Sequence, residues 1–221
     1  MPDCQFAEND YILYINYYGL FCENVKKLTA KYKNIIIDNS QSFYSEPQGI
    51  ASFNSLRKFL PVQNGAYLWG TDNFSEEIPI DELKLQTTDA NQDYEKFKSN
   101  EIILNTEKIK KISPEVEKII SNFDFSKDKN TRIKYFRLYK EFFDKYNLIE
   151  LPELKDNIPF CYPLCTDNTE VIQKLNKNNI TIIKLWNEFP KDFPEHKFIN
   201  NVGALPLYNE LTAEKIISCF Q

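Results

Sequence analysis

Apolar residues in the first part of the chain occur in short runs separated by one helical segment. Residues 11–18 form a β-branched and aromatic run and residues 34–38 a continuous apolar run, which is typical of strands. Between them, residues 23–32 place apolar side chains three or four positions apart, as in a helix. This order predicts a βαβ unit with parallel strands. Ligands of such units bind at the carboxyl ends of the strands, where Gly19 and Asp38 are expected.

Two more short strands are expected at residues 49–54 and 66–69. The segment between them, residues 57–65, contains a proline and ends in an Asn-Gly turn signal. The sequence therefore predicts a partial, parallel-rich sheet of about four strands.

From residue 87 the pattern changes to long charged helices. Their apolar positions form two stripes, Ile109, Ile112, Val116, Ile119 and Phe123 in the first, and Ile133, Phe136, Tyr139, Phe142 and Tyr146 in the second. Ser113 and Pro114 can cap and restart the first helix. We expect both stripes to face a core rather than a cofactor.

The last part of the chain again mixes strands and helices. Strands are expected at residues 158–164 and 180–185, and helices at residues 169–177 and 212–220, the last with Thr212 as its cap. This pattern predicts a smaller α/β unit.

The change in pattern near residue 88 divides the chain into two predicted domains. Residues 1–88 are expected to form part of a large sheet domain, and residues 89–221 a helical connection followed by a small C-terminal α/β domain. The predicted fold class is therefore α/β.

Composition describes an ordinary folded protein. Hydrophobic residues make up 42% of the chain, aromatic residues 14% and charged residues 27%. The formal charge of −5, without a basic stripe, argues against nucleic acid as a partner. No apolar run approaches the ~18 to 20 residues of a membrane span, and the start lacks the order of a signal peptide. These features predict a cytoplasmic protein that does not bind membranes.

Three common kinds of site find no support in the residues. No G-x-G-x-x-G follows the first strand and no G-x-x-x-x-G-K-[ST] occurs, and the single histidine, His196, argues against a Ser-His-Asp triad. Of five cysteines, only Cys161 and Cys165 lie close together. Zinc sites need further Cys or His ligands, so we expect buried, reduced thiols and no metal.

One candidate functional residue remains, an acidic residue at the end of a predicted strand. Asp38 leaves the run Ile-Ile-Ile and is followed three positions later by Gln41. An aspartate at this place fits a helix cap, a ribose ligand or a purely structural role.

The surrounding segments favour a fourth role for Asp38. Residues 35–41, 51–58 and 62–66 together resemble the DegT-like sugar aminotransferases, which are pyridoxal-phosphate enzymes of the aspartate-aminotransferase fold. The resemblance continues at both ends, through residues 12–19, 158–164, 180–186 and 203–207, in family order. It implies a partial three-layer sheet of an aminotransferase-type large domain, followed by a small α/β domain.

The resemblance also implies a cofactor site. Asp38 stands where the family binds the pyridine nitrogen, which keeps that nitrogen protonated so that the ring can accept electrons. Gln41 stands where the family places a His or Gln against the ring. Ser52 matches a serine that resembles a phosphate ligand.

The lysine that holds the cofactor in the family has no direct match. It lies five residues after the serine, where this chain has Arg57, and a guanidinium with a pKa above ~12 does not supply a free amine. Lys58, one residue later, can take the place of this lysine if the loop holds one residue more than in the family. Asn64 and Gly65 align with the family without a gap, which counts against an extra residue. We nevertheless take Lys58 as the candidate catalytic residue.

Family members carry a long additional segment ahead of residues 12–19, which holds N-terminal helices and most of the phosphate cradle. The resemblance thus implies a truncated or split form, acting with a separately encoded N-terminal piece or as a homodimer. An active assembly would use a nucleotide-linked keto-sugar and an amino donor in amino-sugar (surface polysaccharide) biosynthesis. The alternatives are a non-catalytic remnant or interaction module that does not bind pyridoxal phosphate, and a nucleotide-binding βαβ protein.

Overall fold

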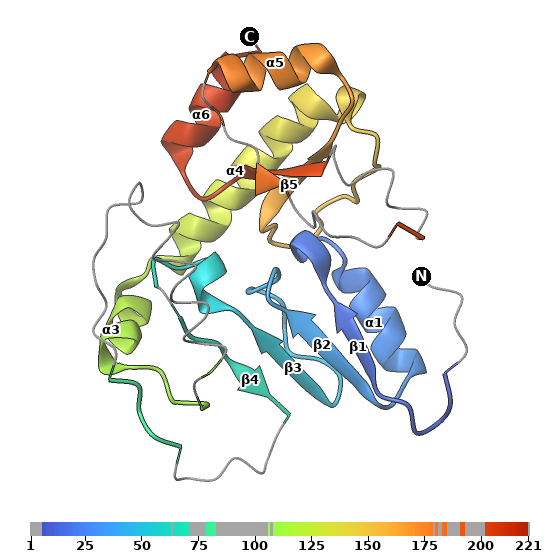
Figure 1. The fold of residues 1–221 in the computed structure, drawn as a ribbon, viewed down its shortest axis with the longest axis vertical. Coiled ribbons are helices and arrows are strands. Elements are labelled where there is room, and N and C mark those ends of the chain that lie inside the picture. Colours follow the sequence, from blue (N-terminus) through green and yellow to red (C-terminus); the bar gives the residue numbers. More distant parts are fainter. Residues whose placement is uncertain are drawn as a thin grey trace.

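The computed structural model describes residues 6–62, 64–70, 78–82, 106, 108–178, 180, 183–184, 191–192 and 202–220. These residues contain two sheets, of four and three strands. Figure 1 shows the four-stranded sheet with α1 beside it, and a second lobe built from α4, α5, α6 and β5. The predicted domain boundary near residue 88 lies outside the described residues and stays a prediction.

The first sheet has the order β1-β2-β3-β4. Its strands are β1 (Ile12–Ile15), β2 (Ile35–Asn39), β3 (Ala51–Asn54) and β4 (Leu68–Trp69). The first three are parallel, and β4 is antiparallel to β3. The expected βαβ unit is present, with α1 (Cys22–Lys31) joining β1 to β2.

One face of this sheet packs against α1. Ile35 and Ile37, both fully buried, share a core cluster with Val25 and Leu28 of the helix. Side chains alternate along a strand, so Ile36 and Asp38 point to the opposite face.

Between the sheets, the chain forms two consecutive helices. The first, α3 (Pro114–Asn122), begins where Ser113 Oγ accepts the Val116 N–H, as expected from the Ser-Pro signal. The second, α4 (Phe125–Phe143), begins with Asp124 as its cap and is followed by the short helix η3 (Asp144–Tyr146).

The prediction that Ile109 begins the first apolar stripe is wrong. Ile109 is 72% exposed, and the neighbouring Lys111 forms a parallel bridge with Ile80. Proline at residue 114 disfavours a helical conformation in the residue before it, so the helix cannot extend back through Ile112.

The second lobe is a small antiparallel sheet with helices. Its strand order is β5-β7-β6, formed by β5 (Cys161–Cys165), β7 (Val202–Pro206) and β6 (Ile183–Lys184). The helix α5 (Thr169–Lys177) lies where the sequence predicted it.

The closing helix, α6 (Glu210–Ser218), begins earlier than predicted. Asn209 Oδ1 accepts the Thr212 N–H at 3.1 Å, so Asn209 and not Thr212 is the cap. Both residues have good capping side chains, and the sequence alone does not rank them.

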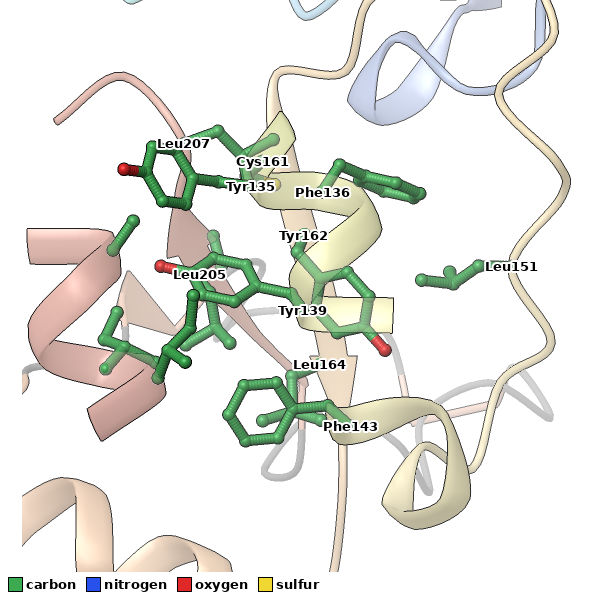
Figure 2. Packing of buried hydrophobic residues seen from close by; sticks show 14 of the residues in the cluster. Tyr135, Phe136, Tyr139, Phe143, Leu151, Cys161, Tyr162, Leu164, Leu205 and Leu207 are labelled. Carbon is green, nitrogen blue, oxygen red and sulfur yellow. The ribbon is translucent and has the colours of Figure 1, made fainter. Parts of the chain in front are cut away.

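Aromatic side chains of α4 form the centre of this lobe. Phe136, Tyr139 and Phe143 are fully buried and pack around Tyr162 of β5, with ring centroids 5.4 to 6.2 Å from the Tyr162 ring. Figure 2 shows Leu205 beside these rings. The second predicted stripe is therefore confirmed as core-facing.

Three features of the described residues concern membrane spans, metal ligands and disulfides. None of the described helices is both long and apolar enough to cross a membrane. The described residues contain no group of three His, Cys, Asp or Glu side chains placed to hold a metal ion. The described cysteines are unbridged, and burial raises the pKa of the Cys161 thiol.

Candidate functional site at the carboxyl edge of the sheet

The parallel strands β1, β2 and β3 end together at one edge. Ile15 pairs with Asp38, and Asp38 pairs in turn with Phe53, so the residues that follow each strand meet at this edge. The loop carrying Gly65 also lies here, because its carbonyl accepts the Leu56 N–H at 3.0 Å just beyond β3. Open parallel sheets bind ligands at such edges.

Asp38 lies at this edge, half-buried, on the face that α1 does not cover. Its Oδ1 accepts the Ser40 N–H at 2.7 Å, which fixes the turn after β2. Burial raises the pKa of the Tyr17 phenol, and the negative charge of Asp38 raises it further. The phenol is therefore close enough to Asp38 to sense its charge.

Gln41 holds the turn that follows β1. Its Oε1 accepts the Tyr18 N–H at 2.9 Å. Tyr18 lies within the short helix η1 (Tyr17–Gly19) and has a φ of 60°, which is strained for a residue with a side chain. The Gln41 side chain therefore takes part in fixing this turn.

Gly19 is required beside this turn. Its φ is +68°, and an added Cβ would lie 2.5 Å from the Ile158 carbonyl oxygen. We expect Gly19→Ala to lower the free energy of unfolding by about 1 to 3 kcal/mol, measured by urea denaturation. An unchanged midpoint would show that the turn adjusts freely.

Ser52 faces the other side of the sheet. It pairs with Ile37, which packs under α1, whereas Asp38 pairs with Phe53. Ser52 is 1% exposed and its Oγ has no hydrogen-bond partner. The structure thus does not bring the Ser52 hydroxyl and the Asp38 carboxylate together.

Arg57 and Lys58 follow β3 directly. Both belong to the short helix η2 (Leu56–Lys58) and are half-buried. Leu56 and Phe59 are buried on either side of them and anchor this helix in a core cluster. The two cationic side chains therefore lie close to the end of β3, one position apart.

A row of buried asparagines crosses the same edge and was not predicted. Asn16, Asn39 and Asn54 each follow or end a strand and are at most 3% exposed. Asn16 Nδ2 donates to Asn39 Oδ1 at 3.1 Å and to Ser42 Oγ at 3.0 Å. Asn54 Oδ1 accepts the Tyr67 N–H. The signal was present in the sequence, since each of the three strands has an asparagine as its last residue or directly after it.

Tyr44, Asp128 and Arg132 form a polar clamp that joins the loop after β2 to α4. Asp128 Oδ2 accepts the Tyr44 hydroxyl at 2.6 Å and Arg132 Nε at 2.7 Å. Arg132 is fully buried, its Nη1 donates to the Phe160 carbonyl, and its guanidinium stacks 4.6 Å from the Phe59 ring centroid. Burial raises the pKa of Tyr44, and the bond to Asp128 raises it further. Sequence reasoning had treated α4 as a source of apolar contacts only.

Aromatic rings extend this clamp. The Phe43 ring stacks on Phe59 and on Phe125, with centroid distances of 5.5 and 6.1 Å. Such contacts hold the loop that carries Gln41 against η2 and α4. The loop after β2 and the helix with Lys58 are thereby fixed to one another.

A groove of about 390 Å³ lies beside the clamp, between the starts of α4 and α6. Asp128 lines it from one side and Glu210 and Tyr208 from the other, with Lys127 adding a positive charge. Its mixture of aromatic and charged groups suits a small polar ligand.

The arrangement fits the ring end of pyridoxal phosphate. Asp38 uses one carboxylate oxygen for Ser40, which leaves the other to accept a pyridinium N–H. Lys58 lies in the short helix η2, directly after the next strand, β3. The phosphate end needs donors other than Ser52, because that hydroxyl lies beneath the opposite face.

The comparisons with known proteins rest on structure alone. No family model and no curated protein matches the sequence. The fold is similar to that of AtS13 from Actinomadura melliaura, with 11% sequence identity and a TM-score of 0.56 over 95% of this chain and 65% of AtS13. It is also similar to S. venezuelae DesV, solved in complex with a ketimine intermediate, with 13% identity and a TM-score of 0.53 over 94% of this chain and 63% of DesV.

These likenesses establish the fold class. The chain shares with both neighbours the α/β fold that the sequence predicted, with a parallel-rich sheet and flanking helices. It spans less than two thirds of the length of both neighbours. The roles of Asp38, Gln41, Ser52 and Lys58 toward a cofactor stay predictions.

Proposed function

We propose that this chain is part of a sugar aminotransferase-like protein that binds pyridoxal phosphate at the carboxyl edge of its parallel sheet. The observation that carries the proposal is the position of Asp38 at that edge, beside the strand that leads to Lys58. The shared fold with AtS13 and DesV, and the ketimine intermediate of DesV, support it.

The residues of the edge have separate roles in this proposal. Bound pyridoxal phosphate would supply an electron sink for the substrate carbanion. Asp38 would keep the pyridine nitrogen protonated through a charge-assisted hydrogen bond. Lys58 would hold the cofactor and move the proton at the substrate carbon, as general acid–base catalysis requires.

The surrounding residues would hold these groups in place. Gln41 fixes the turn after β1, and the Asp128–Arg132 pair fixes the loop after β2. The rings of Phe43 and Phe59 would exclude water from the side of the site that faces α4. The substrates would be a nucleotide-linked keto-sugar and an amino donor, in amino-sugar biosynthesis for surface polysaccharide.

A second candidate function is a non-catalytic interaction module that does not bind the cofactor. Two observations favour it. Arg57 occupies the position at which the resembling family has its lysine, and Ser52 points away from Asp38. A protein that had lost the cofactor would keep the fold and the clamp without needing either group.

Titration with pyridoxal phosphate separates the two candidates. We expect the purified chain to bind about one equivalent and to develop the visible absorbance of a lysine-bound cofactor. Asp38→Ala should weaken this band, whereas Glu170→Gln, in an exposed ion pair of α5, should not. A spectrum equal to that of free pyridoxal phosphate would favour the interaction module.

A further inference from the structure

The ring of Phe59 anchors the short helix that carries Lys58. Phe59 directly follows Lys58 at the end of η2, and its N–H donates to the Leu56 carbonyl at 2.9 Å. Its side chain is buried in the same core cluster as Leu56. Because a 3₁₀ helix of three residues has few hydrogen bonds of its own, the packing of this ring fixes the backbone beside Lys58.

Among the described residues, the Phe59 ring contacts three other aromatic rings and a cation. The rings are Phe43 at a centroid distance of 5.5 Å, Tyr44 at 5.8 Å and Phe160 at 5.4 Å. The cation is the guanidinium of Arg132, which lies 4.6 Å from the centroid of Phe59. A cation over an aromatic face is held by the ring, and the attraction is stronger where water is excluded, as it is here.

Arg132 joins these neighbours of Phe59 to one another. Its Nε donates to Asp128 Oδ2, and the same carboxylate oxygen accepts the Tyr44 hydroxyl. Its Nη1 donates to the Phe160 carbonyl at 2.9 Å. One fully buried side chain therefore holds the groups on two sides of the Phe59 ring in a fixed arrangement.

The same side chain is linked to the turn after β1. The Phe160 N–H donates to the Tyr18 carbonyl at 2.7 Å, so the residue whose carbonyl binds Arg132 also holds η1. Gln41 holds η1 from its other side, by accepting the Tyr18 N–H. Arg132 thus lies where the segments that follow β1, β2 and β3 at the carboxyl edge are joined.

Stability alone does not account for an arginine at this junction. The attraction within a buried ion pair is largely offset by the cost of removing both charges from water. Arginine does combine two properties that the junction uses. Its donors point in the plane of the guanidinium, toward Asp128 and Phe160, while the face of the same plane packs on Phe59.

We propose that Arg132 is a positioning residue for Lys58, and that it acts through the Phe59 ring to hold the lysine amine at the carboxyl edge. The inference rests on the proposed function in taking Lys58 as the amine that reacts with the cofactor. Arg132 is fully buried, and its role is to hold other residues rather than to bind a ligand.

The double variant Asp128→Leu with Arg132→Met tests this role separately from stability, because it removes both charges and leaves neither unpaired. We expect its circular dichroism and its urea midpoint to stay close to those of the wild type. At about one equivalent of pyridoxal phosphate, borohydride should nevertheless fix the pyridoxyl group to Lys58 about ten to a hundred times more slowly, because the amine is displaced.

A second variant and a matched control make this result specific. Phe59→Leu keeps the ion pair and an apolar side chain but loses the flat ring, and it should slow the reaction of Lys58 in the same way. The control is Leu175→Ala, at a fully buried position of α5 in the other core cluster, which lowers stability away from the junction. While folded, it should react at the wild-type rate.

Amide hydrogen exchange measures the same effect without the cofactor. The N–H groups of Phe59 and Leu60 both donate to the Leu56 carbonyl, and we expect both to exchange faster in the double variant and in Phe59→Leu than in the wild type. A wild-type chain that forms no adduct at Lys58 would contradict the proposed function, and the exchange rates would then decide the positioning role by themselves.

Three results would overturn the positioning role. They are a wild-type rate of pyridoxylation in the folded double variant, unchanged exchange at Phe59 and Leu60, or an equal loss of rate in Leu175→Ala. The last result would show that the reaction of Lys58 follows overall stability and not the contact between Arg132 and Phe59.

Discussion

Replacing Asp128 by asparagine should lower the free energy of unfolding by about 3 to 5 kcal/mol. The Arg132 guanidinium is fully buried, and Asp128 is its charged partner at 2.7 Å. Asparagine keeps the shape and can still accept a hydrogen bond, but it leaves a buried positive charge without its counter-ion. Urea denaturation of both proteins, with equal m-values, gives the difference.

Two further variants make this prediction specific. The double variant Asp128→Leu with Arg132→Met removes both charges and should recover most of the lost stability, since apolar replacements of buried ion pairs are often neutral. Glu170→Gln breaks an exposed pair on α5, with side chains 45% and 76% exposed, and should cost less than about 1 kcal/mol. A loss below about 1 kcal/mol for Asp128→Asn would mean that water reaches Arg132.

Lys58→Met should abolish the pyridoxyl adduct that borohydride fixes to the protein. At about one equivalent of cofactor, the bound aldehyde is expected to react with the lysine amine beside it, and methionine keeps the length and apolar stem of lysine without the amine. Intact-mass measurement after reduction should find one added pyridoxyl group on the wild type and none on the variant.

Arg57→Met is the matched control, because it changes the neighbouring residue of the same short helix. It should retain the adduct, since a guanidinium does not form the bond. Loss of the adduct in both variants would point to a disturbed helix rather than to a missing amine. Retention in Lys58→Met would assign the adduct to another lysine.

Much of the fold was readable from hydrophobic spacing. The alternation of apolar runs gave the βαβ unit, and the spacing of Phe136 and Tyr139 gave the buried side of α4. The strand β7 was not predicted, because it includes Gly203 and Ala204, which have low strand propensity and depend on pairing with β5.

The candidate site shows where sequence reasoning stops. The sequence placed Asp38 and Ser52 on neighbouring strands, and the family resemblance made both candidates for cofactor contact, but only the register decides which face each side chain takes. Asp38 pairs with Phe53, one residue after Ser52, and a difference of one residue reverses the face. The pair of Asp128 and Arg132 was missed for a related reason. Charged residues on a helix are normally solvated, and only the packing shows that the side chains of Arg132 and Asp128 are 0% and 8% exposed.

The central claim is that the carboxyl edge of the sheet is a cofactor site with Lys58 as its amine. Peptide mapping after incubation with pyridoxal phosphate and reduction by borohydride tests it most directly. We predict that the pyridoxyl mass is found on a single peptide, the one containing Lys58. A mass spread over exposed lysines such as Lys26 and Lys174, or found on no peptide, would contradict the claim.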